Sequence, residues 1–229
     1  MKKSLFCLVG LCCIGFAEVK CVRKAPRTPA PRRPPQQRPR QAAPEKLSAL
    51  RDRLLRLLIE SAELQTFLAM ISFAEGTYKN GVASYSSFFW TPRHKAPYMT
   101  SFAQHPCEVR KGRAGNHEFR STAAGRYMIL CRIWEQIARK MRLTDFGPLN
   151  QDLAATYLIY EHGALGDVLN LRIREAIKKL RPVWASFPPP YYQGQRAKPL
   201  SMLLQFFYEH YPSYREGVQN NKSTYAQWG

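Results

Sequence analysis

Apolar side chains recur at helical spacing over most of the chain from residue 45 onward. In residues 45–60, leucines return every three or four positions between arginines, which predicts an amphipathic helix. Such a stripe can lie on a membrane, but packing onto a folded domain is its more common fate. A second and more uniformly apolar helix is predicted over residues 64–75, ended by Gly76. The same spacing predicts four further helices, over residues 124–141, 150–162, 165–180 and 200–210.

Residues 77–120 break this helical pattern. They contain turn-forming residues, aromatic residues and prolines with little helical period, which indicates loops and a small β-hairpin. The expected fold is therefore α+β and mostly helical. It forms one domain over residues 45–229, with an irregular lobe inserted after the helix that ends at residue 75.

The first 17 residues have the pattern of a secretory signal peptide. A basic start, Met1-Lys2-Lys3, precedes the apolar run LFCLVGLCCIGF, and small residues occupy positions 15 and 17. This run is too short to anchor the chain across a bilayer. We expect cleavage after Ala17 and a secreted protein, in the periplasm or on the cell wall. Attachment as a membrane lipoprotein is the lesser alternative.

Residues 18–44 are rich in proline and arginine and contain few large apolar side chains. They cannot form a core, which indicates a disordered and semi-rigid basic tether. The formal charge of +19 suits an anionic wall polymer or a membrane surface as a partner of residues 22–44, although a simple solvated spacer has the same composition. Nucleic acid is not expected as a partner, because the chain carries an export signal.

The cysteines fit an oxidising compartment. Removal of the signal peptide leaves Cys21, Cys107 and Cys131 of the original six. A disulfide between Cys107 and Cys131 is possible, but spacing alone does not establish the pairing.

Glu75 is the first candidate catalytic residue in the sequence. This carboxylate ends the apolar helix, where the helix dipole disfavours a negative charge, and Leu68 and Ile71 lie one turn before it. Such surroundings raise a carboxyl pKa and suit a general acid. Glycosidases normally use two carboxylates, yet no Asp or Glu lies between Gly76 and Cys107. One residue that acts first as acid and then as base, with a nucleophile supplied by the substrate, would need no second carboxylate.

Other kinds of site have little support in the sequence. The five histidines show no HExxH arrangement or pairing four residues apart, so no metal site is predicted. A glycine-rich phosphate loop and a GxSxG nucleophile elbow are also absent from the sequence.

Four blocks occur in the order found in one known family. They are FLAMISFAEGT from residue 67, STAAGRYMIL from 121, NQDLAATYLIYEHGAL from 150 and VWASFP from 183. Together they resemble the lambda-type phage endolysins over about residues 64–195. The resemblance implies a lysozyme-like domain with two lobes and a glycan-binding cleft between them. It also implies a lytic transglycosylase that needs no cofactor and cleaves the N-acetylmuramic acid–β-1,4–N-acetylglucosamine bond of peptidoglycan glycan strands. In that reaction Glu75 is the acid and then the base, and the product has a 1,6-anhydromuramyl end.

The resemblance also implies a set of substrate-binding residues, namely Ser121, Gly125, Tyr127 and Tyr192. Structural roles are also open for all four, and Tyr192 could either stack on a sugar or pack at the rim of the cleft. The segment from residue 121 could begin a helix, with the glycine allowing close packing, and Tyr127 could belong to the core. Asn150 is expected to cap the helix that follows it.

The sequence departs from the family pattern in residues 85–106 and at Met128, which replaces a glutamine. Two alternatives therefore stay open. One is a hydrolytic muramidase that uses Glu108 or Glu118 as the second carboxylate. The other is a protein that binds cell-wall glycan without cutting it. In each case we expect a monomer.

Overall fold

The structure is a computed structural model that describes residues 44–79, 84–89, 98–114, 117–191 and 197–220. These residues belong to one compact unit, Ala42–Gly229. The predicted signal peptide and basic tether lie outside the described residues, as does Tyr192.

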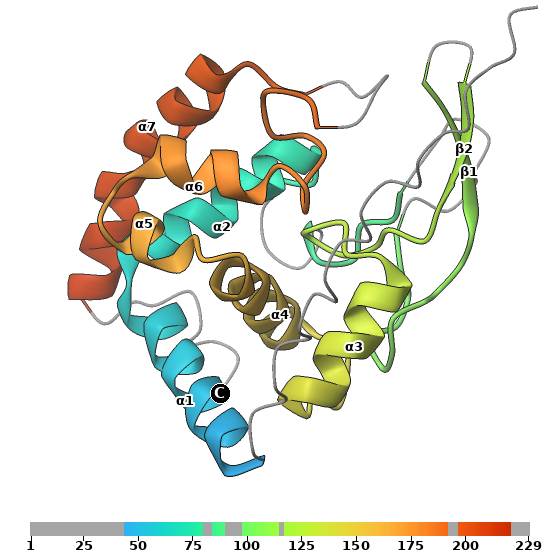
Figure 1. Cartoon of the computed structure of the whole chain (residues 1–229), viewed down its shortest axis with the longest axis horizontal. Helices are drawn as coiled ribbons and strands as arrows, with labels where there is room; N and C mark the ends of the chain where they lie inside the picture. The colour runs from blue at the N-terminus through green and yellow to red at the C-terminus, as the bar shows by residue number, and fades with distance from the viewer. Residues whose placement is uncertain (1–43, 80–83, 90–97, 115–116, 192–196, 221–229) are drawn as a thin grey trace, which may run out of the picture. The chain divides into compact units, whose positions relative to one another are not determined.

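Seven helices and one antiparallel hairpin make up the described part of this unit (Figure 1). In chain order they are α1 (Pro44–Glu60), α2 (Ala62–Glu75), β1 (Arg110–Ala114), β2 (His117–Ser121), α3 (Cys131–Met141), α4 (Pro148–Glu161), α5 (Leu165–Leu169), α6 (Ile173–Leu180) and α7 (Leu200–Gln219). The α+β, mostly helical class predicted from the sequence is confirmed.

Helix α2 forms the centre of the domain. It packs against α1, α4, α5 and α7, which lie around it in Figure 1. Eleven of its residues are buried, on every face of the helix, which explains why its sequence is uniformly apolar rather than amphipathic. The hydroxyl of Ser61 caps its start by accepting a hydrogen bond from the Leu64 N–H at 3.1 Å.

Helix α1 uses its leucine stripe for packing. Leu54 and Leu58 are completely buried, and the helix contacts α2, α3 and α4. Among the described residues, no single helix has the length and apolar content needed to cross a membrane. Helices α1 and α2 meet those criteria only as a pair, and the chain bends by 86° between them.

The segment from residue 124 to 130 is not helical, contrary to the sequence-based expectation. Ala124 and Ile129 instead exchange two backbone hydrogen bonds of 3.1 and 3.0 Å across a tight turn. Gly125 and Met128 adopt positive φ angles of 78° and 47°, which a right-handed helix cannot accommodate. Helix α3 therefore begins only at Cys131.

Two other helix boundaries differ from the prediction. Helix α4 begins at Pro148, because proline is well suited to the first position of a helix. Asn150 therefore lies inside the first turn and does not cap the helix. The Asn150 amide instead donates to the Asp145 carbonyl at 3.1 Å. The predicted helix over residues 165–180 is split into α5 and α6, because Leu171 adopts a left-handed φ of 57° between them.

The predicted hairpin is present as β1 and β2, which extend away from the helices at the right of Figure 1. The loop that contains this hairpin is closed by a disulfide between Cys107 and Cys131. The pairing that the sequence left open is thus observed. It ties the start of the hairpin to the first residue of α3.

Substitution of Gly125 tests how much the turn before α3 contributes to the stability of the fold. A Cβ atom at this position would lie 2.4 Å from Gln151 Oε1 and 2.9 Å from Phe146 Cζ, in addition to the cost of its positive φ. We expect Gly125→Ala to lower the free energy of unfolding by about 2–4 kcal/mol. Urea denaturation followed by circular dichroism measures this change.

Gly163→Ala is the matched control. Gly163 has a similar φ of 68°, but a Cβ atom there would meet nothing within 4 Å. Its substitution should cost only about 1 kcal/mol. Equal losses in the two variants would show that close packing against Gln151 contributes nothing.

Candidate active site

Glu75 is the last residue of α2, and the chain turns immediately after it. Gly76 adopts a left-handed conformation, φ 74° and ψ 18°, and its N–H donates to the Phe73 carbonyl at 3.2 Å. The N–H of Thr77 donates to the Ser72 carbonyl at 2.9 Å. These bonds end the helix in the manner that a glycine favours, and they fix the backbone that carries the carboxylate.

A cluster of buried hydroxyls fastens this helix end to the segments beside it. Ser72 Oγ lies 3.0 Å from Thr77 Oγ1 and 3.2 Å from Ser84 Oγ. The Thr77 hydroxyl also bonds the carbonyl of Arg126, and Ser84 Oγ donates to the Thr77 carbonyl at 2.8 Å. The position of Glu75 is therefore coupled to the turn at residue 126.

The side chain of Glu75 is half-buried and is held by Ser186. The Ser186 hydroxyl donates to Glu75 Oε1 at 2.6 Å, and the backbone N–H of Ser186 bonds the same carboxylate. In turn the Ser186 carbonyl accepts a hydrogen bond from the N–H of Lys198 at 2.9 Å. Two segments that follow α6 thus meet at the end of α2.

Burial raises the pKa of Glu75 from its ordinary value of 4.5 to about 7. The hydrogen bonds from Ser186 and the positive charge of Lys198 act in the opposite direction, because they stabilise the carboxylate. At neutral pH the side chain is consequently present in both protonation states. That balance suits a group that must first give up a proton and then accept one.

Within the described part of the chain, the groups that set this pKa are Ser186 and Lys198, and no carboxylate is among them. Glu108 forms an ion pair with Arg110, whose Nε lies 3.1 Å from Glu108 Oε1. Glu118 is exposed on β2. Of the two carboxylates considered as partners for Glu75, Glu108 is thus ion-paired and Glu118 is exposed to solvent.

The structure places Tyr127 in the core, which corrects its predicted role in substrate binding. Its side chain is completely buried, and its hydroxyl donates to the carboxylate of Asp152. The Tyr85 hydroxyl donates to the same carboxylate at 2.8 Å. A buried carboxylate needs hydrogen-bond donors such as these two hydroxyls. Because Tyr127 supplies one of them from a completely buried position, its side chain cannot also contact a glycan.

Gly125 also has a structural role. It is buried, and its N–H donates to the Ser87 carbonyl at 2.7 Å. The Gln151 amide lies against it and accepts a hydrogen bond from the Arg126 N–H at 2.9 Å. A side chain at position 125 would displace this amide, so close packing is sufficient to explain the glycine.

Ser121 remains a candidate for substrate binding. It ends β2, is partly exposed, and its hydroxyl accepts a hydrogen bond from the Ala123 N–H at 3.1 Å. Because Ser121 is the last residue of a strand, it does not begin a helix, which was the structural role considered for this segment. The fourth candidate, Tyr192, lies outside the described residues.

The roles of Ser186 and Lys198 are not visible in the sequence. The block VWASFP includes Ser186, so a signal was present, but 111 positions separate this serine from Glu75. Spacing along the chain cannot reveal a contact at that separation. Only the packing of the segment after α6 against the end of α2 brings the two side chains together.

The raised pKa of Glu75 makes stability depend on pH. Between 4.5 and about 7 the folded state binds more protons than the unfolded state, so the stability given by the neutral carboxyl is complete below pH 4.5. It is lost as the pH rises through about 7. The glutamine of Glu75→Gln cannot ionise, so relative to this variant the natural chain should lose up to about 3 kcal/mol between pH 4.5 and pH 8. Urea unfolding at several pH values measures the difference, and a difference independent of pH would contradict the raised pKa.

Ser186→Ala should raise the pKa of Glu75 further, because the variant removes the hydroxyl that stabilises the carboxylate. The pKa is measured from the carboxyl ¹³C chemical shift of Glu75, assigned with the Glu75→Gln variant. Ser201→Ala is the control, since Ser201 is exposed at the start of α7. An unchanged or lower pKa in Ser186→Ala would show that this hydrogen bond does not stabilise the charged form.

The chain is similar to two endolysins of known sequence. The endolysin of Escherichia phage P2 is 35% identical over 146 residues, which cover 62% of this chain and 88% of that protein. The endolysin of Escherichia phage lambda is 33% identical over 142 residues, covering 62% and 87%.

Two solved structures share the fold. Bacteriophage lambda lysozyme complexed with a chitohexasaccharide matches with a TM-score of 0.58 and 29% identity, over 65% of this chain and 94% of that one. A second structure of lysozyme from bacteriophage lambda matches with a TM-score of 0.50 and 25% identity, over 72% and 96%. The fold is thus lysozyme-like, as the four sequence blocks implied. Residues 65–212 match the family model described as Endolysin, and the chain therefore belongs to the endolysin family.

Proposed function

We propose that this protein cleaves the glycan strands of peptidoglycan as a lytic transglycosylase. The bond cut is the β-1,4 linkage between N-acetylmuramic acid and N-acetylglucosamine, and the product carries a 1,6-anhydromuramyl end. Membership of the endolysin family supports the substrate class. The observation that carries the reaction type is a half-buried Glu75 with a pKa of about 7, for which no carboxylate of the described residues is among the groups that set it.

One carboxyl group is sufficient for this reaction. Glu75 in its protonated form donates its proton to the glycosidic oxygen as the bond from that oxygen to muramyl C1 breaks. The 6-hydroxyl of the same muramyl residue attacks C1 and gives its proton to the Glu75 carboxylate. Glu75 is then protonated again, no water is consumed, and no second acidic residue takes part.

Ser186 and Lys198 support both halves of this cycle. The Ser186 hydroxyl holds one oxygen of Glu75 at 2.6 Å, and the Ser186 backbone N–H also bonds the carboxylate, which fixes its orientation. When the proton has left, this hydrogen bond and the charge of Lys198 stabilise the carboxylate, so that burial does not raise its pKa much above 7. Activity should consequently decline as the pH rises above about 7, because the acid form is lost.

A glycan strand is the proposed partner. The solved relative complexed with a chitohexasaccharide supports this, since a chitohexasaccharide is a chain of linked amino sugars. The proposed contacts are Ser121, at the end of β2, and Tyr192.

The segments before the compact unit extend the proposal. The signal-like residues 1–17 would direct export, and the basic residues 22–44 would then hold the enzyme near an anionic wall polymer or membrane surface. An exported product with the mass of residues 18–229 would support this, whereas a full-length product would contradict it.

Mass spectrometry of digested peptidoglycan tests the reaction. Residues 18–229 and the Glu75→Gln variant are incubated with purified sacculi, and the muropeptide ends are compared. We expect anhydromuramyl ends from the unmutated chain and a loss of activity of at least about 100-fold in the variant, which is nearly isosteric but cannot donate the proton. Circular dichroism confirms that the variant remains folded.

Each of the other outcomes contradicts the proposal in a distinct way. Reducing muramyl ends would indicate a hydrolytic muramidase, in which a second carboxylate such as Glu108 or Glu118 activates water. Sacculi that are bound but not cut would indicate a glycan-binding protein. Undiminished cutting by the folded Glu75→Gln variant would show that the acid lies elsewhere.

A further inference from the structure

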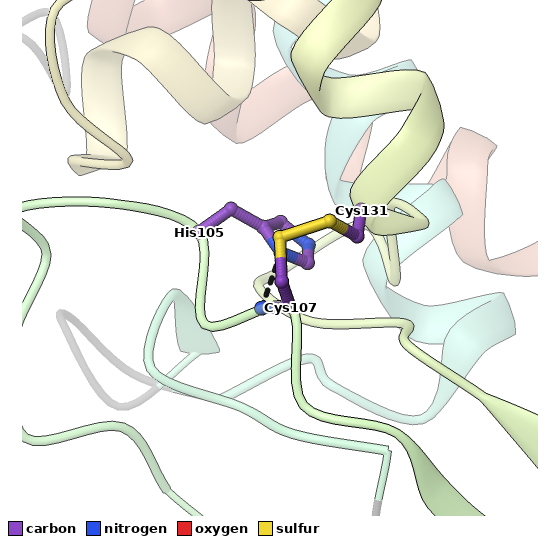
Figure 2. Close-up of side chains that lie close together, drawn as sticks. All are labelled: His105, Cys107 and Cys131. Carbon is purple, nitrogen blue, oxygen red and sulfur yellow. Dashed lines mark hydrogen bonds between the residues drawn. A yellow bond between two sulfur atoms is a disulfide. The ribbon is translucent and has the colours of Figure 1, made fainter.

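A second cluster of chemically active side chains lies around the disulfide, apart from Glu75. Figure 2 shows the imidazole of His105 beside the bond that joins Cys107 to Cys131. His105 and Cys107 belong to the loop before β1, and Cys131 is the first residue of α3. Their potential ligand atoms all lie within 4.8 Å of one another. The family comparisons and the proposed reaction give this cluster no role.

The hydrogen bonds of His105 determine which nitrogen is available. His105 Nε2 lies 2.9 Å from the Ile129 carbonyl, which can only accept, so we assign the ring proton to Nε2. Nδ1 then carries a lone pair and accepts a hydrogen bond from the Cys107 N–H at 3.0 Å. A backbone carbonyl that holds the far nitrogen is the usual support of a metal-binding histidine.

The spacing of these atoms suits a tetrahedral metal. His105 Nδ1 lies 3.4 Å from Cys107 Sγ. Glu135, one turn further along α3, has Oε1 3.6 Å from Cys131 Sγ. Bonds of about 2.3 Å to sulfur and about 2.0 Å to nitrogen or oxygen place neighbouring ligands of tetrahedral zinc about 3.5–3.8 Å apart. Metal binding requires the two sulfurs to separate from the disulfide, and the carboxylate of Glu135, which is not part of the cluster of the other three residues, to turn toward the metal.

We propose that reduction of this disulfide creates a zinc-binding site formed by His105, Cys107, Cys131 and Glu135. A dithiol reductant supplies two electrons and two protons, leaves as its own disulfide and yields two protein thiols. Zinc then binds both sulfurs as thiolates and releases two protons. The metal also replaces the Cys107 N–H at His105 Nδ1. Neither cysteine is buried, so a reductant can reach the bond.

Together, the disulfide and the zinc site would keep Cys107 joined to Cys131 in both oxidising and reducing compartments. The disulfide joins residues 24 positions apart and closes the loop that contains the β1–β2 hairpin. In a reducing compartment the covalent link is lost, and zinc would join the same two residues. The hairpin would thus stay attached to α3 both before and after transfer to an oxidising compartment.

Cobalt(II), a spectroscopic substitute for zinc, tests the proposal. The full chain is prepared with Cys7, Cys12, Cys13 and Cys21 changed to serine, so that only the disulfide cysteines remain, and is compared in oxidised and reduced form. We expect the reduced form to bind one cobalt per chain, with a thiolate-to-cobalt charge-transfer band and the intense visible bands of tetrahedral cobalt. Zinc should displace it, and the oxidised form should show neither band.

Variants distinguish the site from non-specific thiol binding. Cys131→Ser should abolish the charge-transfer band characteristic of two thiolates, and His105→Gln should weaken cobalt binding at least tenfold. Glu135→Gln is expected to weaken cobalt binding. Glu175→Gln is its control and should leave cobalt binding unchanged, because Glu175 lies on α6, which carries none of the four proposed ligands. Binding that does not require reduction, or that is unaffected by His105→Gln, would overturn the proposal. Loss of helical circular dichroism on reduction would also overturn it, because no preformed site would then exist.

Discussion

Burial of α2 on every side is the constraint on which the rest of the structure depends. A helix that hides all its faces cannot offer a polar side chain to solvent along its length, so chemistry is confined to its ends. Glu75 occupies the carboxyl end, where the surrounding domain removes most of its hydration and raises its pKa to about 7. The same packing that stabilises the fold therefore creates the acid.

The end of α2 is held by contacts that come from distant parts of the chain. The hydroxyls of Thr77 and Ser84 connect it to the turn at residue 126, and Ser186 reaches the carboxylate itself. That turn is fixed from the other side by α4, whose Gln151 and Asp152 are completely buried and hydrogen-bonded. Tyr127, which the resemblance implied as a substrate-binding residue, thus belongs to the packing behind the candidate acid.

The disulfide cluster has an observed role in a covalent link and a proposed role in metal binding. In the oxidised chain, Cys107 and Cys131 form a covalent link between the hairpin loop and α3. His105 and Glu135, the other two proposed ligands, come near the cysteines only in the tertiary structure, since they are 30 positions apart in the sequence. A search for closely spaced histidines in the sequence could not find this arrangement. The proposed zinc site and the proposed glycan cleavage use separate residues, so each can fail without the other.

The sequence by itself determined the fold class, most of the helices, the hairpin and the identity of Glu75 as the candidate acid. These follow from local periodicity, from a glycine that ends a helix and from a carboxylate in an apolar setting, all of which act within a few residues. Tertiary structure alone decided that Ser186 holds Glu75, that Tyr127 is buried and that residues 124–130 form a turn. Such features depend on which surfaces pack together, and the free energy of that packing is not encoded in any short segment.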